Sequence, residues 1–288
     1  MRMNTGILFG LGAMLAWGIM DFLAAIACRK IGDYRAFFWP QLIGFVFIVI
    51  AYFFFGKPIA LDKFFYILAF AGVLDMIGYI YFYRGLSKGL VGIVSPITSM
   101  FASVTVILSI IFLGEKVTLL QIFSIILIVI GCFLVSTDIK EFFNSKKTKL
   151  AEGVKEGLVA MVCWGILFTL IAYSVRAVGW FMPVLIMRIF LIFPFIAFAK
   201  VKKVPLKFES NTMIIGLLVV MAILDVAAFL SLNFGVMGHE ASIVAPVSST
   251  YPLLTISLAY IFLKERMAPN QYIGAVVAIS GMVLLSIV

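Results

Sequence analysis

Charged residues are scarce in this sequence. Asp, Glu, Lys and Arg make up 12% of the 288 residues, whereas 64% are hydrophobic. Soluble domains carry about 25% charged and 45–50% apolar residues. So few polar side chains cannot cover an aqueous surface, which excludes a soluble globular protein. The net charge is +9, and most of the basic residues lie in short gaps between apolar runs. They therefore indicate loops at a membrane surface rather than nucleic-acid binding.

Metal-binding and catalytic patterns are also lacking. The chain has one histidine and three cysteines, and these form no CxxC, HExxH or other ligand motif. The cysteines lie within apolar runs, where free cysteine usually acts as a small hydrophobic residue. No P-loop is present. We therefore expect no metal, no cofactor and no enzyme active site.

Long apolar runs occupy most of the sequence. A helix of about 20 apolar residues spans a bilayer, and these runs lack the alternation of β-barrel strands. The first run is too long for the core of a signal peptide, so we expect it to be a span. The sequence predicts an all-α integral membrane protein, multi-pass in the cell membrane, with ten spans. They cover residues 6–28, 37–55, 64–83, 91–113, 119–136, 157–175, 181–199, 213–233, 241–263 and 270–287.

The second half of the chain repeats the first. Residues of unusual type recur 147 positions apart in the first two spans of each half and 150 apart from the third span onward. Apolar composition alone does not produce such matches. The matched pairs include Trp17 and Trp164, Gly18 and Gly165, Gly32 and Gly179, Asp75 and Asp225, Pro96 and Pro246, and Glu115 and Glu265.

Each half has five predicted spans, an odd number, so the second half enters the membrane in the opposite orientation. The sequence therefore predicts two inverted five-helix repeats, at residues 1–138 and 157–288, joined by a basic loop at 139–156. Inverted repeats are typical of carriers that alternate between inward-open and outward-open shapes.

The order and spacing of these motifs resemble the drug/metabolite transporter superfamily, specifically ten-helix members with two EamA-type domains. The resemblance covers nearly the whole chain. It rests on the early Trp-Gly of each half and on a glutamate 19 positions after the proline of the fourth span in each half. Family members often have an arginine in the second helix of each half. Here Arg188 fits, but the matched position is Gln41.

The resemblance implies a secondary transporter that moves small organic metabolites, such as amino acids, related compounds or drugs, by alternating access. The partners expected are a small-molecule substrate and the lipid bilayer, with the protein a monomer or weak homodimer. The alternatives are a flippase for a lipid-linked polar substrate and a membrane enzyme. The excess of basic residues in alternate gaps predicts both termini outside, whereas the family resemblance predicts both inside.

Ionisable residues inside the spans are the candidates for function. Each costs about 2.5–3.5 kcal/mol at a bilayer centre, so each needs a role. Asp75, Tyr79 and Tyr83 share one helical face, as do the matched Asp225, Phe229 and Asn233. We predict a substrate cavity between the halves, although the same residues could instead hold helices together. The predicted site residues are Trp17, Asp75, Tyr79, Tyr83, Ser99, Trp164, Arg188, Asp225, Asn233, Ser249 and Tyr251.

The two aspartates of the repeat are expected to differ. Arg188 lies deep in a span of the second half, so it is the expected partner of Asp225. Asp75 lacks such a cation and is the candidate for proton coupling.

Three further expectations concern residues outside this set. Asp21 is expected to be hydrated near an interface, with a functional role as the alternative. Pro96 and Pro246 are expected to lie in first turns of helices or, alternatively, to free backbone groups for a ligand. Glu115 and Glu265 are expected to form surface ion pairs or loop caps.

Overall fold

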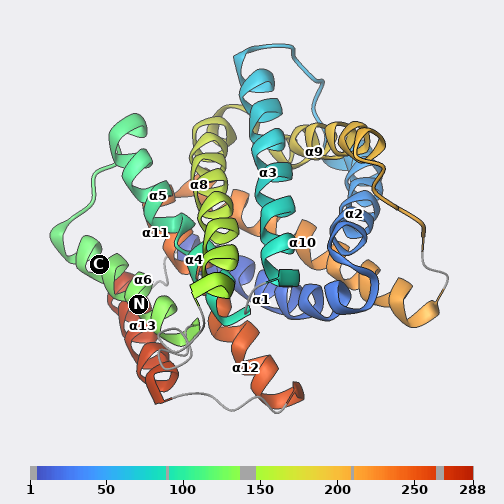
Figure 1. The fold of residues 1–288 in the computed structure, drawn as a ribbon. Coiled ribbons are helices and arrows are strands. Elements are labelled where there is room, and N and C mark those ends of the chain that lie inside the picture. The colour runs from blue at the N-terminus through green and yellow to red at the C-terminus, as the bar shows by residue number, and fades with distance from the viewer. Residues whose placement is uncertain (1–4, 89–90, 137–146, 209–210, 264–268, 288) are drawn as a thin grey trace.

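The described part of the chain is helical. The computed structural model describes residues 5–88, 91–136, 147–208, 211–263 and 269–287, and every regular element within these ranges is a helix. The elements of Figure 1 are α1 (Thr5–Ile31), α2 (Asp33–Phe55), α3 (Lys63–Lys88), α4 (Val91–Ser99), α5 (Phe101–Leu108), the π-helical turn η1 (Ser109–Leu113), α6 (Leu119–Ser136), α8 (Lys147–Val178), α9 (Met182–Val201), α10 (Thr212–Gly238), α11 (Ala241–Ser248), α12 (Tyr251–Leu263) and α13 (Pro269–Ile287).

Seven helical segments are long and apolar enough to cross a membrane, by length and composition. Three shorter apolar helices accompany them among the described residues. The all-α fold class is thus confirmed for this part of the chain, whereas the count of ten spans and the inverted orientation of the halves stay predictions. The seven segments are Thr5–Ile31, Asp33–Phe55, Lys63–Lys88, Gly153–Val178, Met182–Val201, Thr212–Gly238 and Ala241–Phe262, and the shorter ones are Ile97–Leu113, Leu119–Leu134 and Tyr272–Leu285.

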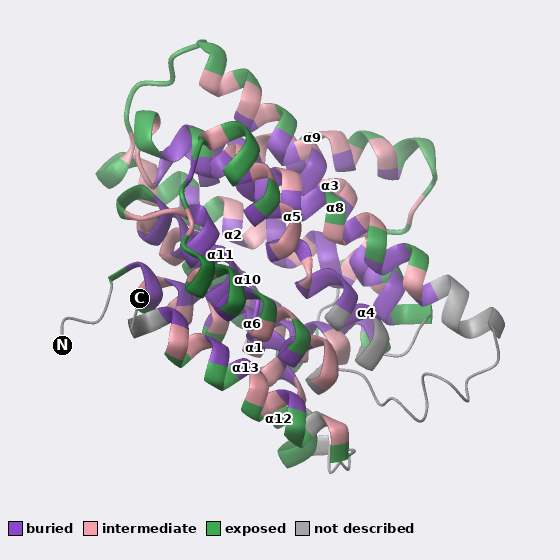
Figure 2. Ribbon diagram, turned by 90° about the vertical axis from the view of Figure 1, so that its left-hand side faces the viewer, coloured by how far each residue is buried: buried purple, intermediate pink, exposed green. Residues whose placement is uncertain are grey.

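Large apolar side chains cover the outer surface of the bundle. Phe53, Phe54 and Leu119 are 80%, 78% and 86% exposed. In Figure 2 the buried residues gather where helices meet, and the exposed residues lie along the outer turns. An apolar surface of this extent is stable against lipid tails rather than against water.

The fourth and ninth predicted spans are each interrupted near the middle. Met100 separates α4 from α5, and Ser249 and Thr250 separate α11 from α12. Pro246 lies inside α11, so the prediction that it occupies a first turn is wrong. A proline inside a helix lacks the N–H for the backbone bond and clashes with the preceding turn, which favours a break nearby.

Hydroxyl side chains near these interruptions donate hydrogen bonds to nearby backbone carbonyls. Ser249 Oγ donates to the carbonyl of Pro246 at 2.8 Å, and Thr250 Oγ1 donates to that of Val247 at 2.7 Å. In the other half, Thr98 Oγ1 donates to the carbonyl of Val94 at 3.0 Å. These bonds give carbonyls beside the breaks partners within the protein, which lipid tails cannot supply.

The two halves pack against each other through matched helices. α1 packs on α10 and α12, while α8 packs on α3 and α5. Thr255 Oγ1 donates to the carbonyl of Gly18 at 3.0 Å, and the matched Thr105 Oγ1 donates to the carbonyl of Gly165 at 3.2 Å. The glycine after each tryptophan thus permits close approach of a helix from the other half, because a Cβ at either glycine would collide with a side chain there.

The last helices of the halves, α6 and α13, lie side by side (Figure 1). A Cβ on Gly131 of α6 would collide with Ala278 of α13, and a Cβ on Gly281 of α13 would collide with Ile128 of α6. These two positions are matched in the repeat, so the same small residue allows close packing from both sides.

Two connections are shorter than the apolar runs suggested. Gly32 alone separates α1 from α2, and its matched residue Gly179 begins the short link after α8. Their φ angles are 82° and 85°, which glycine adopts without a steric cost.

The predicted basic loop at 139–156 is wrong in its second part, because α8 already begins at Lys147. Residues 137–146 lie outside the described part.

Glu115 caps a helix of the opposite half. Its carboxylate oxygens accept the backbone N–H groups of Ala241 and Ser242, each at 2.9 Å, at the start of α11. The first N–H groups of a helix have no partner within it, and an anion there also interacts favourably with the helix dipole. Of the two expectations for Glu115, the cap is therefore present and the surface ion pair is wrong, because the residue is only 8% exposed. Glu265 lies outside the described residues.

Removal of this cap should destabilise the protein. We expect Glu115→Ala to lower the free energy of unfolding by about 1–2 kcal/mol, the usual cost of losing a helix cap. The measurement is the thermal unfolding midpoint in detergent. Glu240→Ala is the control, because Glu240 precedes the same helix without a side-chain capping bond. Equal midpoints for the two variants would contradict the capping role.

Candidate functional site

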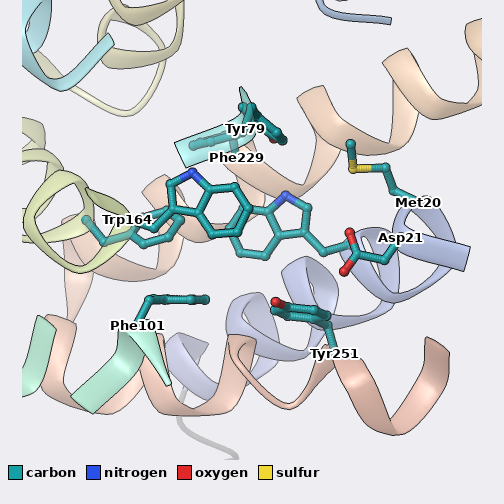
Figure 3. A pocket seen from close by; sticks show the side chains of 9 residues that line it. Met20, Asp21, Tyr79, Phe101, Trp164, Phe229 and Tyr251 are labelled. Carbon is teal, nitrogen blue, oxygen red and sulfur yellow. The ribbon is translucent and has the colours of Figure 1, made fainter. Parts of the chain in front are cut away.

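A cavity lies among helices α1, α3, α5, α8, α10 and α12 (Figure 3). It holds about 360 Å³ of space that no protein atom fills, its mouth included. Seven of its nine lining residues are aromatic. The lining residues are Trp17, Met20, Asp21, Tyr79, Phe101, Trp164, Phe168, Phe229 and Tyr251.

The lining comes from matched positions of the two halves. Eight of the nine residues form four pairs related by the repeat spacing. One pair is identical, and each of the other three pairs a polar residue in one half with an apolar residue at the matched position of the other half. The pairs are Trp17 with Trp164, Asp21 with Phe168, Tyr79 with Phe229, and Tyr251 with Phe101.

The aromatic rings contact one another around the cavity. Trp17 lies edge-on to Phe229 with centroids 5.4 Å apart, and 5.6 Å from Phe168. Phe168 also packs on Phe101 at 4.7 Å. Such ring pairs add stability beyond their buried area, so the wall is well ordered and mainly apolar.

Asp21 is the acidic group of this wall. It is 8% exposed, and no described residue forms a hydrogen bond with its Oδ2 atom. Figure 3 shows its carboxylate beside the cavity, on the same side as Tyr251. The expectation of a hydrated interfacial position is wrong, because α1 continues to Ile31 and leaves residue 21 well inside the helix.

An ion pair lies behind the cavity wall. Arg188 Nη2 donates to Asp225 Oδ2, and both side chains are buried. Tyr79 donates its hydroxyl to Asp225 Oδ1 at 2.6 Å, and Gln41 Nε2 lies 3.4 Å from Oδ2. The Arg188 guanidinium lies over the ring of Phe229 at 5.6 Å. The expected contact between Arg188 and Asp225 is thus present, and Gln41, its counterpart in the first half, reaches the same carboxylate.

Asp75 has different partners from Asp225. The indole Nε1 of Trp164 donates to Asp75 Oδ1 at 3.1 Å, and Asp75 is 2% exposed. Trp164 itself lines the cavity, so Asp75 holds a cavity ring without lining the cavity. Within the described residues Asp75 forms no ion pair.

Four of the predicted site residues line the cavity, namely Trp17, Tyr79, Trp164 and Tyr251. Asp75, Arg188 and Asp225 lie behind the wall, bonded to one another or to lining residues. Ser99 is buried outside the lining, and Ser249 bonds to its own helix.

Two predicted residues of the polar and aromatic stripes point elsewhere. Asn233 donates its amide to the carbonyl of Trp180 at 2.9 Å, and Tyr83 packs on Phe37 and Phe82. The lining residues that the sequence prediction left out are Met20, Asp21, Phe101, Phe168 and Phe229. The repeat spacing carried a signal for two of them, because Phe101 matches Tyr251, and Phe229 matches Tyr79.

The sequence matches a known family in both halves. Residues 4–137 and 153–287 each match the model of the EamA-like transporter family. The chain belongs to this family. It is therefore a multi-pass integral membrane protein of a transporter family, as its apolar helices indicate. The resemblance to transporters with two EamA-type domains is confirmed.

Two individual proteins resemble this EamA-family chain. An uncharacterized protein of Methanocaldococcus jannaschii is 36% identical over 139 residues, which are 46% of this chain and 98% of the relative. A protein of known crystal structure aligns with a TM-score of 0.81 at 12% identity, over 99% of this chain and 98% of its own. At that identity the second match supports the fold alone.

The buried ion pair of this EamA-family protein should be sensitive to loss of one partner. Asp225→Asn leaves Arg188 buried without its counter-ion, which typically costs about 3–5 kcal/mol. We expect a lower yield of folded protein and a lower unfolding midpoint in detergent.

Two matched variants test the origin of that loss. Arg188→Gln combined with Asp225→Asn removes the stranded charge and should recover part of the stability. Asp75→Asn makes the same chemical change at the matched position, where Trp164 can still donate, and should cost less. If Asp75→Asn and Asp225→Asn lower the midpoint equally, the ion pair is not the dominant contribution.

Proposed function

We propose that this protein is a secondary carrier that moves a small organic molecule across the membrane by alternating access. The observation that carries the proposal is the cavity lining, which draws four matched pairs of residues from the two halves. A substrate held there contacts both halves, so a change in their relative positions changes its access to each side of the membrane.

An inverted repeat of ten spans is part of the proposal. The matched contacts of Thr105 with Gly165 and of Thr255 with Gly18 support a two-fold relation between the halves. The relative of half this length supports it too, because a unit of about one half exists as a separate chain. With five spans in each half, that relation inverts the second half.

The interruptions of the fourth and ninth spans are the proposed hinges. Phe101 is the first residue of α5 and Tyr251 the first of α12, so a lining residue directly follows each break. Hinges are usually a few residues at element ends that absorb large backbone changes. Bending at Met100 or at Thr250 would therefore move a wall of the cavity.

The proposed energy source is a proton gradient, coupled to transport through Asp75. Asp75 accepts the indole N–H of Trp164, and a hydrogen bond to an ionised carboxylate is stronger than one to a neutral group. Uptake of a proton by Asp75 would weaken its hold on a ring that lines the cavity. The proton and the substrate would in this way act on the same side chain.

Accessibility to thiol reagents tests alternating access. The natural cysteines, all free and buried, are first replaced by alanine. We expect Phe168→Cys and Tyr251→Cys to react with a membrane-impermeant maleimide from either face, in right-side-out and inside-out vesicles. Ile48→Cys, which is buried in α2 away from the cavity, should stay unreactive. Labelling from one face only, under every solute gradient tried, would count against alternating access.

The role of Asp75 is tested by transport in proteoliposomes. Asp75→Asn should abolish accumulation driven by a pH gradient, because the amide cannot exchange a proton. Counterflow exchange should persist, since it needs only substrate binding and the conformational change. The solute is one that stabilises the purified protein in a thermal screen. Asp33→Asn, an acid-to-amide change outside the cavity, is the control. Unchanged pH-driven accumulation by Asp75→Asn would refute the proton-coupling role.

A further inference from the structure

We infer that the cavity binds an organic cation, an ammonium group on a small apolar body, with the Asp21 carboxylate as its counter-ion. The inference rests on the proposed function only in taking the cavity as the substrate site. It deepens that proposal by naming the substrate class.

The charges around the cavity favour a cationic ligand. Asp21, Asp75 and Asp225 are buried in neighbouring spans, and Arg188 is the one buried cation among the described residues. Arg188 is already paired with Asp225. An ionised carboxylate in a dry environment needs a cation or several hydrogen-bond donors, and no described residue supplies either to Asp21 Oδ2. A bound ammonium group would supply both.

The aromatic lining suits the same ligand. A cation within about 6 Å of a ring centroid is attracted to the negative face of the ring, most strongly by tryptophan and when water is excluded. Trp17 and Trp164 both line this cavity, with five further rings. Aromatic walls around one carboxylate can therefore replace the water shell of an alkylammonium group.

The two hydroxyl groups of the wall already have partners. The Tyr79 hydroxyl donates to Asp225, and the Tyr251 hydroxyl lies 3.3 Å from Thr98 Oγ1. Arg188 has a free Nη1 atom, but it lies behind Phe229 and does not line the cavity. A substrate carboxylate would thus find no cation in the described wall, which disfavours anions and zwitterions.

The two ends of the cavity also differ in polarity. Asp21 and Tyr251 lie toward one end, and Phe101 lies toward the other (Figure 3). Phe101 packs on Phe168, and these two residues are the apolar counterparts of Tyr251 and Asp21. The repeat thus builds a symmetric frame with one polar and one apolar end. An ammonium group would bind at the Asp21 end, with its apolar body among the phenylalanine rings.

The wild-type protein gives the first test. Purified full-length protein in detergent is titrated calorimetrically with phenethylamine, its trimethylammonium derivative, 2-phenylethanol, 3-phenylpropanoate and phenylalanine, which differ in charge on one scaffold. We expect at least one of the two cations to bind about tenfold or more tightly than the neutral, anionic and zwitterionic compounds. Equal or tighter binding of any of those three would overturn the inference, and so would binding of neither cation.

Substitutions of Asp21 give the second test. Asp21→Asn should weaken cation binding about 10- to 100-fold, the range for loss of a hydrogen bond to a charged group, and leave 2-phenylethanol unaffected. Asp33→Asn should change neither affinity. If Asp21→Asn fails to fold, Asp21→Glu keeps the charge and should retain the preference for cations over the neutral alcohol. Unchanged cation affinity in Asp21→Asn would overturn the inference.

Transport assays separate this inference from the proposed function. Cations that bind through Asp21 but are not exchanged by proteoliposomes would refute the carrier and leave the cation site standing. Counterflow of neutral or anionic solutes, undiminished by Asp21→Asn, would support the carrier and refute the cation site.

Discussion

Within a bilayer every buried polar group must find its partner inside the protein, because lipid tails offer none. This constraint accounts for most of the polar contacts described above. The hydroxyls of Thr98 and Ser249 donate to carbonyls near the helix breaks, and the Glu115 carboxylate accepts hydrogen bonds from the first N–H groups of α11. Arg188 is paired with Asp225. Several buried polar atoms among the described residues lack a partner, and the Oδ2 of Asp21 is the one that belongs to a residue of the cavity lining.

The duplicated sequence gives a symmetric frame with unequal chemistry. The glycines after the two tryptophans, the threonines that bond to them and the glycine connectors recur at matched positions. Within that frame Asp21 matches Phe168, and Arg188 matches Gln41. Backbone packing therefore follows the repeat, because close helix approach needs the same small residues in both halves. Ligand contacts depart from it, because one substrate needs only one counter-ion.

Sequence reasoning was most successful where a residue is unusual for its surroundings. Charged and tryptophan residues within apolar runs are costly, so Trp17, Trp164, Arg188 and Asp225 could be singled out without coordinates. It failed for Met20 and Phe168, since an apolar side chain in an apolar helix has no distinguishing feature until its neighbours are known. The polar stripes were also only partly right. Tyr79 lines the cavity while Tyr83 packs on other rings, because a stripe drifts round the helix over two turns.

The sequence by itself determined that lipid surrounds most of the protein, and it determined the helical class, the repeat and the family. These follow from composition, run length and spacing, which are local or additive properties of the chain. Only the tertiary structure decided which aspartate faces the cavity and which residues hold the others. Asp21, Asp75 and Asp225 are equivalent as carboxylates in apolar helices, and they differ in what neighbouring helices bring to them. Trp164 reaches Asp75, and Arg188 reaches Asp225, but no described side chain reaches the Oδ2 atom of Asp21. Those contacts join residues far apart in the chain, so no local pattern encodes them. The sequence indicated only the pairing of Arg188 with Asp225, because Arg188 is the basic residue deep inside a span.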